Sequence, residues 1–206
     1  MSIAPYGLIS RTSVPNILGF YILHEGPLGV FDKTLKEVDY DDFEEESGPK
    51  QFETKGGWLG ITDKYWLAAL IPDQAKKVKT GFRSDKRGNS QVYQADFLSP
   101  ALDVNPGGTI ETKSHFFAGA KEKKLLDSYN ESLKIDKFDL AIDFGWFWFF
   151  TKPFAEALSY FNGMFGNYGI AILILTVIIK LIFFPLANKS YRAMSKMKAL
   201  QPKMEE

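Results

Sequence analysis

The sequence predicts an all-β domain followed by an α-helical membrane region. Three observations lead to this prediction. Short aromatic and β-branched runs alternate with turn-forming residues as far as about Tyr129, an aromatic-rich stretch follows Phe138, and residues 169–186, GIAILILTVIIKLIFFPL, form one apolar run. At about 1.5 Å per residue, a helix of roughly eighteen residues nearly crosses the ~30 Å hydrocarbon core of a bilayer.

The first part of the chain contains a series of short predicted strands. They are residues 17–23, 29–31, 58–61, 65–71, 78–82, 91–97 and 109–117, separated by turn formers such as Glu25-Gly26-Pro27 and Lys86-Arg87-Gly88-Asn89. Their regular spacing favours an antiparallel sandwich over an α/β fold. Residues 119–133 predict a short surface helix that closes the domain, which we expect to span residues 1–137.

No motif in the predicted sandwich is typical of catalysis or metal binding. The acidic run 39–48, DYDDFEEESG, lacks the alternating ligands, central glycine and closing glutamate of an EF-hand loop, and therefore favours a solvated loop over a calcium site. His24 and His115 lie far apart without an HExxH arrangement, and the chain has no cysteine. We expect no metal, no cofactor, no enzymatic reaction and no DNA partner.

Residues 138–168 predict an amphipathic helix at the membrane interface and the corner after it. Phe154, Leu158, Phe161 and Phe165 form one stripe at helical spacing, and Pro153 is expected in the first turn. The pattern also suits a helix that covers a soluble core, but its place before an apolar run and its Trp and Tyr content favour the interface. The expected interfacial anchors are Trp146, Trp148, Phe154 and Phe161. Gly163, Gly166, Asn167 and Gly169 supply the corner.

Residues 169–187 are the expected transmembrane helix, and Lys180 is the charge within it. Thr176 lies four residues earlier on the same helical face, together with Leu173 and Phe183. One interpretation is that Lys180 snorkels toward the interface, roughly 9 Å away, while Thr176 bonds its own helix backbone. The other places both residues on the wall of a hydrated cavity, which requires partner helices.

Residues 188–206 predict a basic helix on the cytoplasmic side. From Lys180 onward the chain holds six of its 25 Lys and Arg but only two of its 25 Asp and Glu, and basic residues beyond a span mark the cytoplasmic side. The helix is expected to start after Pro185 and to kink or stop at Pro202. Met194, Met197 and Lys198 are candidate contacts, with a partner helix, anionic lipid or ribosomal RNA left open.

The N-terminal residues, MSIAPYGLIS, have no basic region and no apolar run long enough for a signal peptide. A domain outside the membrane with no visible export signal leads us to expect a fragment that lacks an upstream anchor. The abrupt ending MEE suggests truncation there too.

Several of these segments occur together in a known family. DFGWFWFF, FNGMFGNYGIAILILTVIIKLIFFPL and NKSYRAMSKMKALQPKMEE follow one another in an order that resembles the YidC branch of the YidC/Oxa/Alb membrane protein insertases. Upstream, YGLISRTSVPN, GFYILHEGPLGVFD and GGWLGITDKYWLAALIP resemble the periplasmic β-supersandwich domain of Gram-negative members. The last residues then correspond to the first arm of a cytoplasmic helical hairpin.

The resemblance implies an insertase and chaperone of the bacterial inner membrane. Its partners would be nascent inner-membrane proteins, the lipid bilayer, the Sec translocon and the ribosome, and its substrate groove would hold a positive charge. Lys180 stands where the family usually has Arg, with Thr176 as a polar neighbour on the same helix. The alternative is a periplasmic β-sandwich binding or sensor module on a single membrane anchor.

Overall fold

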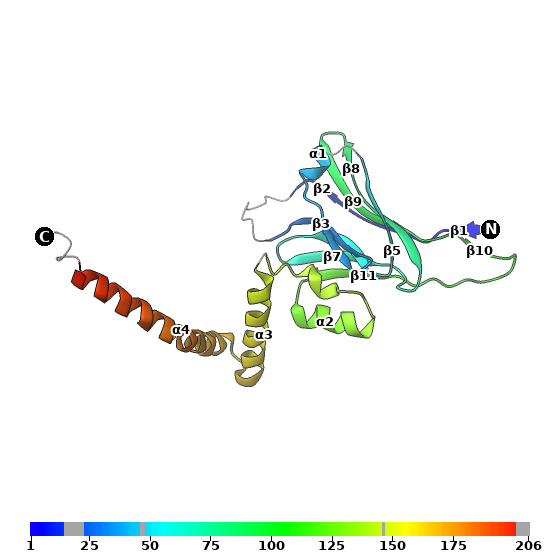
Figure 1. The fold of residues 1–206 in the computed structure, drawn as a ribbon. Coiled ribbons are helices and arrows are strands. Elements are labelled where there is room, and N and C mark those ends of the chain that lie inside the picture. Colours follow the sequence, from blue (N-terminus) through cyan, green and yellow to red (C-terminus); the bar gives the residue numbers. More distant parts are fainter. Residues whose placement is uncertain (15–22, 46–47, 146, 201–206) are drawn as a thin grey trace. The chain divides into compact units, whose positions relative to one another are not determined.

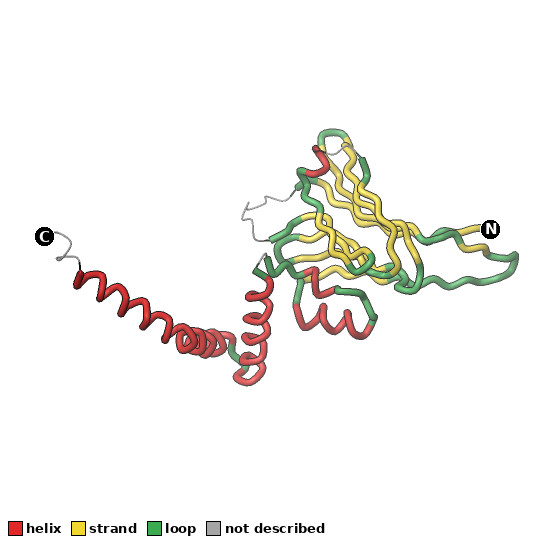
Figure 2. Tube along the Cα trace, viewed as in Figure 1, coloured by secondary structure: helices red, strands yellow, loops and turns green. Residues whose placement is uncertain are grey.

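The computed structural model describes residues 1–206 except 15–22, 46–47, 146 and 201–206. The chain forms two compact units, Met1–Asp143 and Phe144–Glu206. Unit 1 is rich in strands, whereas unit 2 is helical (Figures 1 and 2). The expected fold class, a β-sandwich domain followed by a helical membrane region, is confirmed.

A five-stranded antiparallel sheet forms the centre of unit 1. Its strand order is β11-β7-β6-β3-β4. The strands are β3 (Gly26–Phe31), β4 (Thr34–Glu37), β6 (Trp58–Thr62), β7 (Trp66–Ile71) and β11 (His115–Ala120).

A four-stranded antiparallel sheet packs on one face of the first sheet. Its order is β2-β9-β8-β5, with β2 (Tyr6–Thr12), β5 (Lys50–Lys55), β8 (Lys77–Arg87) and β9 (Ser90–Leu98). Two short strands, β1 (Ser2–Ile3) and β10 (Leu102–Asp103), pair separately. The tight β8–β9 hairpin has Gly88 as its first loop residue, at a φ of 63° that a residue with a Cβ rarely adopts.

The central strands of the five-stranded sheet are buried on both faces. On the inter-sheet face, Leu59 and Leu70 pack with Phe82 and Phe97 of the other sheet. On the opposite face, alternate residues such as Trp58 pack against helical segments. All residues of β3 and β6 are therefore buried, as expected for strands covered on both sides.

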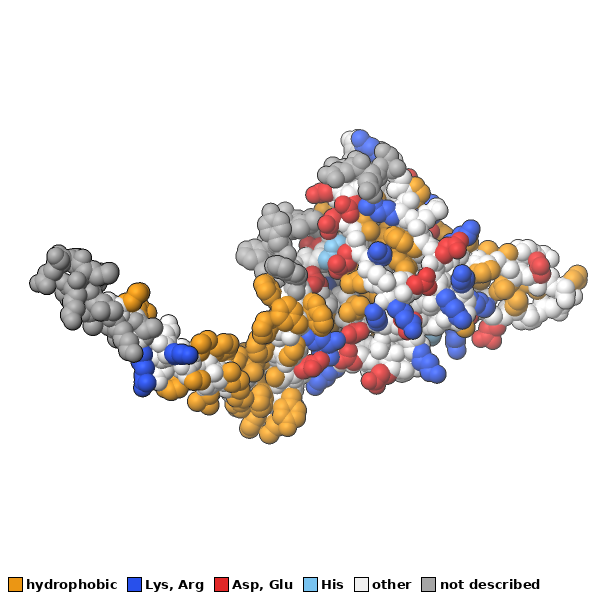
Figure 3. Space-filling model, in the orientation of Figure 1, with side chains coloured by type: hydrophobic (Ala, Val, Ile, Leu, Met, Phe, Trp, Pro, Cys, Tyr) orange, Lys and Arg blue, Asp and Glu red, His pale blue; other side chains and the backbone are white. Residues whose placement is uncertain are grey.

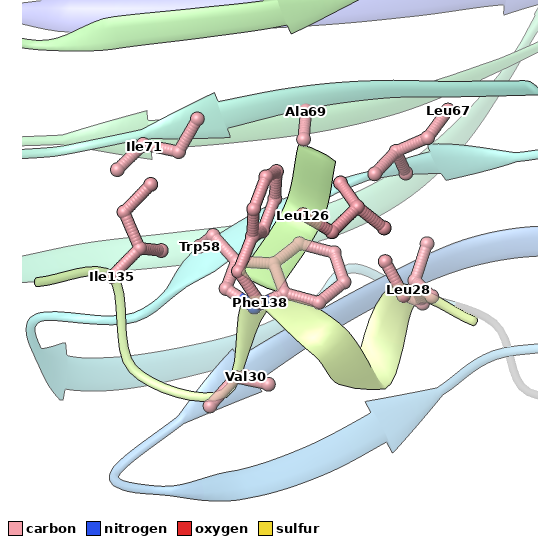
Figure 4. Packing of buried hydrophobic residues seen from close by; sticks show 10 residues of the cluster. Leu28, Val30, Trp58, Leu67, Ala69, Ile71, Leu126, Ile135 and Phe138 are labelled. Atoms are coloured by element: carbon pink, nitrogen blue, oxygen red, sulfur yellow. The ribbon is translucent and has the colours of Figure 1, made fainter. Parts of the chain in front are cut away.

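Two helical segments cover that second face. They are α2 (Lys123–Ser132) and the 3₁₀ helix η1 (Phe138–Ala141), and they bring Leu126 and Phe138 into the core (Figure 4). The Phe138 ring meets the Trp58 ring edge to face at 5.3 Å between centroids. The Phe138 amide donates to Asn130 Oδ1 at 3.1 Å, and Trp58 Nε1 donates to the Lys137 carbonyl at 3.3 Å. These bonds join both helical segments to the sheet.

Most of the predicted strands are present. Residues 29–31, 58–61, 65–71, 78–82 and 91–97 overlap β3, β6, β7, β8 and β9, and 119–133 contains α2. The segment 109–117 is wrong over its first part, because β11 begins only at His115. Residues 17–23 lie almost entirely outside the described residues. The edge strands β2 and β5 were not predicted, since their sequences, YGLISRT and KQFETK, carry many polar residues.

The expected solvated loop at residues 39–48 is partly wrong. Asp42–Glu45 form a short helix, α1. Tyr40 is only 3% exposed, and its ring meets the Tyr93 ring at 4.6 Å between centroids. Tyr40 and Phe43 within the acidic run pack on the core, whereas Asp39 and Asp41 are exposed.

Unit 2 consists of two helices that contact each other, α3 (Trp148–Phe165) and α4 (Tyr168–Leu200). The helix α4 has 33 residues and runs through Pro185. The expectation that a separate helix starts after Pro185 is wrong. A proline inside a helix removes one backbone hydrogen bond without necessarily ending it, and transmembrane helices tolerate this.

We expect Phe138→Ala to lower the free energy of unfolding of unit 1 by about 3–5 kcal/mol, because a fully buried aromatic ring leaves a cavity. Phe116, which is 63% exposed, supplies the control, and Phe116→Ala should change stability by at most about 0.5 kcal/mol. Urea unfolding of the full chain in nanodiscs, followed by near-ultraviolet circular dichroism, measures both. Similar losses in the two variants would contradict the assignment of Phe138 to the core.

Tyr40 gives a prediction for alkaline pH. Burial raises the pKa of Tyr40 to about 12, although the charge of Arg11 opposes this rise. The unfolded tyrosine ionises near pH 10, so between about pH 10 and 12 the unfolded state loses a proton that the folded state keeps. Stability should therefore fall with rising pH, by about 2–3 kcal/mol from this group. The Tyr40→Phe variant should lose correspondingly less stability over that pH range. Parallel curves of the free energy of unfolding against pH for the two proteins would refute the prediction.

Candidate functional site

The helix α3 starts earlier than the sequence predicts. Its first residue is Trp148, so Pro153 lies in the second turn instead of the first. The Trp148 amide donates to the Gly145 carbonyl at 3.0 Å, and Thr151 Oγ1 donates to the Phe144 carbonyl at 2.7 Å. These bonds hold a turn upstream of the proline.

The first turns of α3 expose a cluster of aromatic side chains. Phe147, Trp148, Phe149 and Phe150 are 53–62% exposed, and Phe154 is 41% exposed. Figure 3 shows hydrophobic side chains over α3 and the first part of α4. Of the other expected anchors, Phe161 is half-buried and Trp146 lies outside the described residues. An exposed aromatic surface of this kind suits the headgroup region of a bilayer.

The corner between the two helices is built by two adjacent residues. Gly166 ends α3 with a φ of 66°, and its amide donates to the Asn162 carbonyl at 2.7 Å. Asn167 then begins α4, because its Oδ1 accepts from the amides of Gly169 at 2.7 Å and Ile170 at 3.3 Å. A left-handed glycine and an asparagine N-cap thus satisfy helix ends that would otherwise lack partners.

Part of α4 is long and apolar enough to cross a membrane. Among the described residues, Tyr168–Arg192 is the one helical stretch that meets this condition, with 25 residues and a mean hydropathy of 2.7 over an 18-residue window. At about 1.5 Å per residue, the whole helix measures roughly 50 Å. It therefore exceeds the ~30 Å hydrocarbon core, and its basic end reaches beyond an apolar layer of that thickness.

The two faces of α4 differ in their surroundings. Ala171 is fully buried, and Ile174, Leu175 and Ile179 are half-buried, which marks one face at helical spacing. Thr176 and Lys180 are exposed and lie on the opposite side of the helix, as do Leu173 and Phe183. The polar pair therefore faces away from the packed side of α4.

The hydroxyl of Thr176 is already used as a donor. Thr176 Oγ1 donates to the Ile172 carbonyl at 2.7 Å, one turn earlier in α4. Its oxygen can still accept a hydrogen bond, for example from water or from an ammonium group. The pair then presents one acceptor at Thr176 and three donors at Lys180 on a single helix face.

The basic end of α4 exposes two of the three candidate contacts. Met194 and Met197 are 50% and 71% exposed. Lys198 lies in the same helix, but its side chain is outside the described residues, as is Pro202. Exposed methionines suit adaptable contacts with a partner surface.

No motif in the sequence predicts the polar cluster on the four-stranded sheet. Arg83 Nε and Nη2 donate to Asp96 Oδ2 at 2.9 and 2.6 Å, and Gln94 Nε2 donates to the same oxygen at 2.7 Å. Tyr6, Arg83 and Asp96 also line a cavity of about 600 Å³. Their side chains come from three strands, so only the sheet pairing brings them together.

The candidate metal ligands do not assemble among the described residues. That part of the chain contains no group of three His, Asp, Glu or Cys side chains placed to hold a metal ion. Asp42 of the acidic run instead lies 3.5 Å from Lys50 Nζ. His24 Nδ1 lies 3.2 Å from Asp39 Oδ1 in unit 1.

Comparison with known proteins identifies the family. The family model described as the YidC periplasmic domain matches residues 1–157, and the one described as 60Kd inner membrane protein matches residues 160–206. The chain belongs to the YidC family. The family resemblance expected from the sequence is therefore confirmed, and with it a periplasmic domain joined to an inner-membrane part.

Curated members of the YidC family align with the whole chain. It is 48% identical over 205 residues to a membrane protein insertase of Rickettsia prowazekii (strain Madrid E), and 47% identical to those of Rickettsia massiliae (strain Mtu5) and Rickettsia typhi (strain ATCC VR-144 / Wilmington). These alignments cover the whole of this chain and 37% of the length of each relative. The chain thus spans little more than a third of the length of these YidC proteins.

We expect Asn167→Ala to loosen the start of α4. Loss of an N-cap side chain costs about 1 kcal/mol, which corresponds to roughly fivefold faster opening of the first turn. Hydrogen exchange of the Gly169 and Ile170 amides in nanodiscs measures this change. Asn167→Ser should keep most of the protection because serine also caps helices. Unaltered exchange in Asn167→Ala would show that the cap does not hold the corner.

Proposed function

We propose that this chain is part of an insertase and chaperone that inserts and folds nascent inner-membrane proteins. The observation that carries the proposal is the exposed pair Thr176 and Lys180 on a membrane-length helix, in a chain 47–48% identical to membrane protein insertases. The pair forms one wall of a hydrated substrate groove. The other walls come from helices outside this chain.

The positive charge of Lys180 supplies the attraction in this proposal. A substrate's polar segment enters the groove, and its carboxylates are drawn toward the ammonium group. At an effective dielectric of about 20, two opposite charges 4 Å apart attract by about 4 kcal/mol, against about 1 kcal/mol in bulk water. The attraction is transient, since the substrate's apolar segment partitions into lipid and takes the polar segment out of the groove.

Lysine alters the usual chemistry of this position. An ammonium group keeps the charge of a guanidinium but lacks its planar fork of five donors. Lys180 therefore attracts carboxylates mainly as a point charge, with little selection for a bidentate arrangement.

The proposed arrangement in the membrane assigns a task to each segment. Residues 1–137 form the periplasmic domain, 138–168 the interfacial helix and corner, 169–187 the span, and 188–206 a cytoplasmic hairpin arm. The exposed Lys189 and Arg192 support a cytoplasmic C-terminal end because basic residues beyond a span are retained on that side. Met194, Met197 and Lys198 would contact a partner there, such as the ribosome, and the Sec translocon is the proposed partner in the membrane.

The test replaces the aligned 205 residues of the Rickettsia prowazekii insertase with this chain. We expect the reconstituted chimaera to insert a substrate with an acidic translocated tail, and Lys180→Arg to retain that activity. Lys180→Ala should slow insertion by about fivefold or more if at least 1 kcal/mol of attraction is lost. Protease protection of the translocated tail gives the insertion rate.

Two controls separate the groove from a snorkelling lysine. The same substrate with Asn and Gln in place of its acidic residues should show little difference between Lys180→Ala and the parent. Lys189→Ala removes an exposed cation beyond the apolar run and should leave insertion of the acidic tail nearly unchanged. Equal rates for the parent, Lys180→Arg and Lys180→Ala would remove Lys180 from the groove.

A further inference from the structure

Unit 1 exposes two large aromatic residues next to each other at the turn into β7. Tyr65 is 64% exposed and Trp66 is 61% exposed. Lys64 Nζ lies 5.2 Å from the centroid of the Tyr65 ring, so a cation accompanies the pair. Their side chains are not required for the hairpin, because the hydrogen bonds from Asp63 and Lys121 use the backbone carbonyls of Trp66 and Tyr65.

This aromatic pair lies at the end of unit 1 where the chain leaves the domain. The Lys121 amide donates to the Tyr65 carbonyl at 2.9 Å. Thr62 Oγ1 donates to the Trp66 carbonyl at 3.2 Å, and Thr62 pairs with Gly26, two residues after His24, in the β6–β3 ladder. Asp143 Oδ2 also accepts from the His24 amide at 2.9 Å. Asp143 is the last residue of unit 1.

Covalent geometry limits how far this end can move from α3. Only five residue steps separate Asp143 from Trp148, the first residue of α3. A fully extended chain covers at most about 3.6 Å per residue, so the connection reaches no more than roughly 18 Å. If α3 lies in the membrane interface, the exit end of unit 1 stays close to the same layer.

Charge at this end supplies no strong attraction to anionic lipid. Arg11 pairs with Asp63, and His24 pairs with Asp39. Glu25 and Glu37 add further negative charge around Lys121. Tyr and Trp partition into the headgroup region through their amphipathic rings, which does not require a basic surface.

We propose that Tyr65 and Trp66 form a second membrane contact, through which unit 1 rests on the lipid headgroup layer. The occupant of this surface is the lipid interface itself. The inference rests on the proposed interfacial position of α3, and it adds a contact made by the sheet domain. Two contacts joined by a short connection restrict the tilt of the domain over the membrane.

The absence of cysteine from the chain makes a direct test available. Single cysteines introduced as Tyr65→Cys, Phe116→Cys and Phe154→Cys are labelled with an environment-sensitive fluorophore in the full chain. The variants are placed in nanodiscs of phosphatidylethanolamine and phosphatidylglycerol, with or without a lipid that carries a quencher near its headgroup. We expect quenching at positions 65 and 154 to be several-fold stronger than at 116.

Phe116 is a matched control because its exposed fraction is similar to those of Tyr65 and Trp66 and because it lies in the strand that pairs with β7. It is 63% exposed and pairs with Leu70 in the β11–β7 ladder, whereas Trp66 pairs with Ala120. Along β7, Trp66 and Leu70, the partner of Phe116, are four residues apart. At about 3.4 Å per residue, this separation is roughly 14 Å. In the labelled Tyr65→Cys chain, a further Trp66→Ser change should reduce lipid quenching, whereas Phe116→Ser should not.

Each outcome identifies which proposal fails. Quenching at 154 without quenching at 65 would overturn the second contact and leave the interfacial helix in place. No quenching at either position would reject the interfacial position of α3 as well. A label at 65 that is shielded from aqueous iodide but not quenched by lipid would show that protein covers the surface, and would also overturn the proposed lipid contact.

Discussion

Unit 1 depends on the burial of the central strands of its five-stranded sheet on both faces. The four-stranded sheet covers one face through Phe82 and Phe97, and α2 and η1 cover the other through Leu126 and Phe138. Without Phe138 and its contact with Trp58, the second face would expose a large apolar surface. The same segment carries the chain to Asp143, where the domain ends. Folding of the sheet and the position of the exit are therefore linked.

The strands that could be predicted are those with buried, aromatic or β-branched sequences. β6 and β7, WLGIT and WLAALI, are typical examples. β2 and β5 were not predicted because their sequences carry many polar residues. Each lies at a sheet edge, where one face is solvated and polar residues are tolerated. The composition change at Phe138 was visible, but Phe138 itself packs in unit 1. Aromatic content alone cannot distinguish a core ring from an interfacial one.

For the candidate site on α4, the sequence predicts which residues share a helix face but not which face of the helix is packed. A period of 3.6 residues places Thr176 and Lys180 on one face of any regular helix. Which face packs depends on the contacts of the folded helices, and residues 169–187 of α4 are apolar on nearly every side. The expected helix boundary at Pro185 was wrong because helix propensities measured in water apply poorly to a helix in a membrane. The corner was easier, since Gly166 and Asn167 follow local capping rules.

Thr176 and Lys180, the polar pair on α4, differ in what they require from their surroundings. Thr176 is satisfied as a donor by the Ile172 carbonyl and can lie deep in an apolar layer at little cost. Lys180 is exposed on the same face, and a charged ammonium group requires water, a counter-charge or the interface. The ammonium group of a lysine is a compact and strongly hydrated charge with three donors. In the proposed substrate groove, the water around Lys180 would therefore be part of the site, because it solvates the charge that the proposal relies on to attract a substrate.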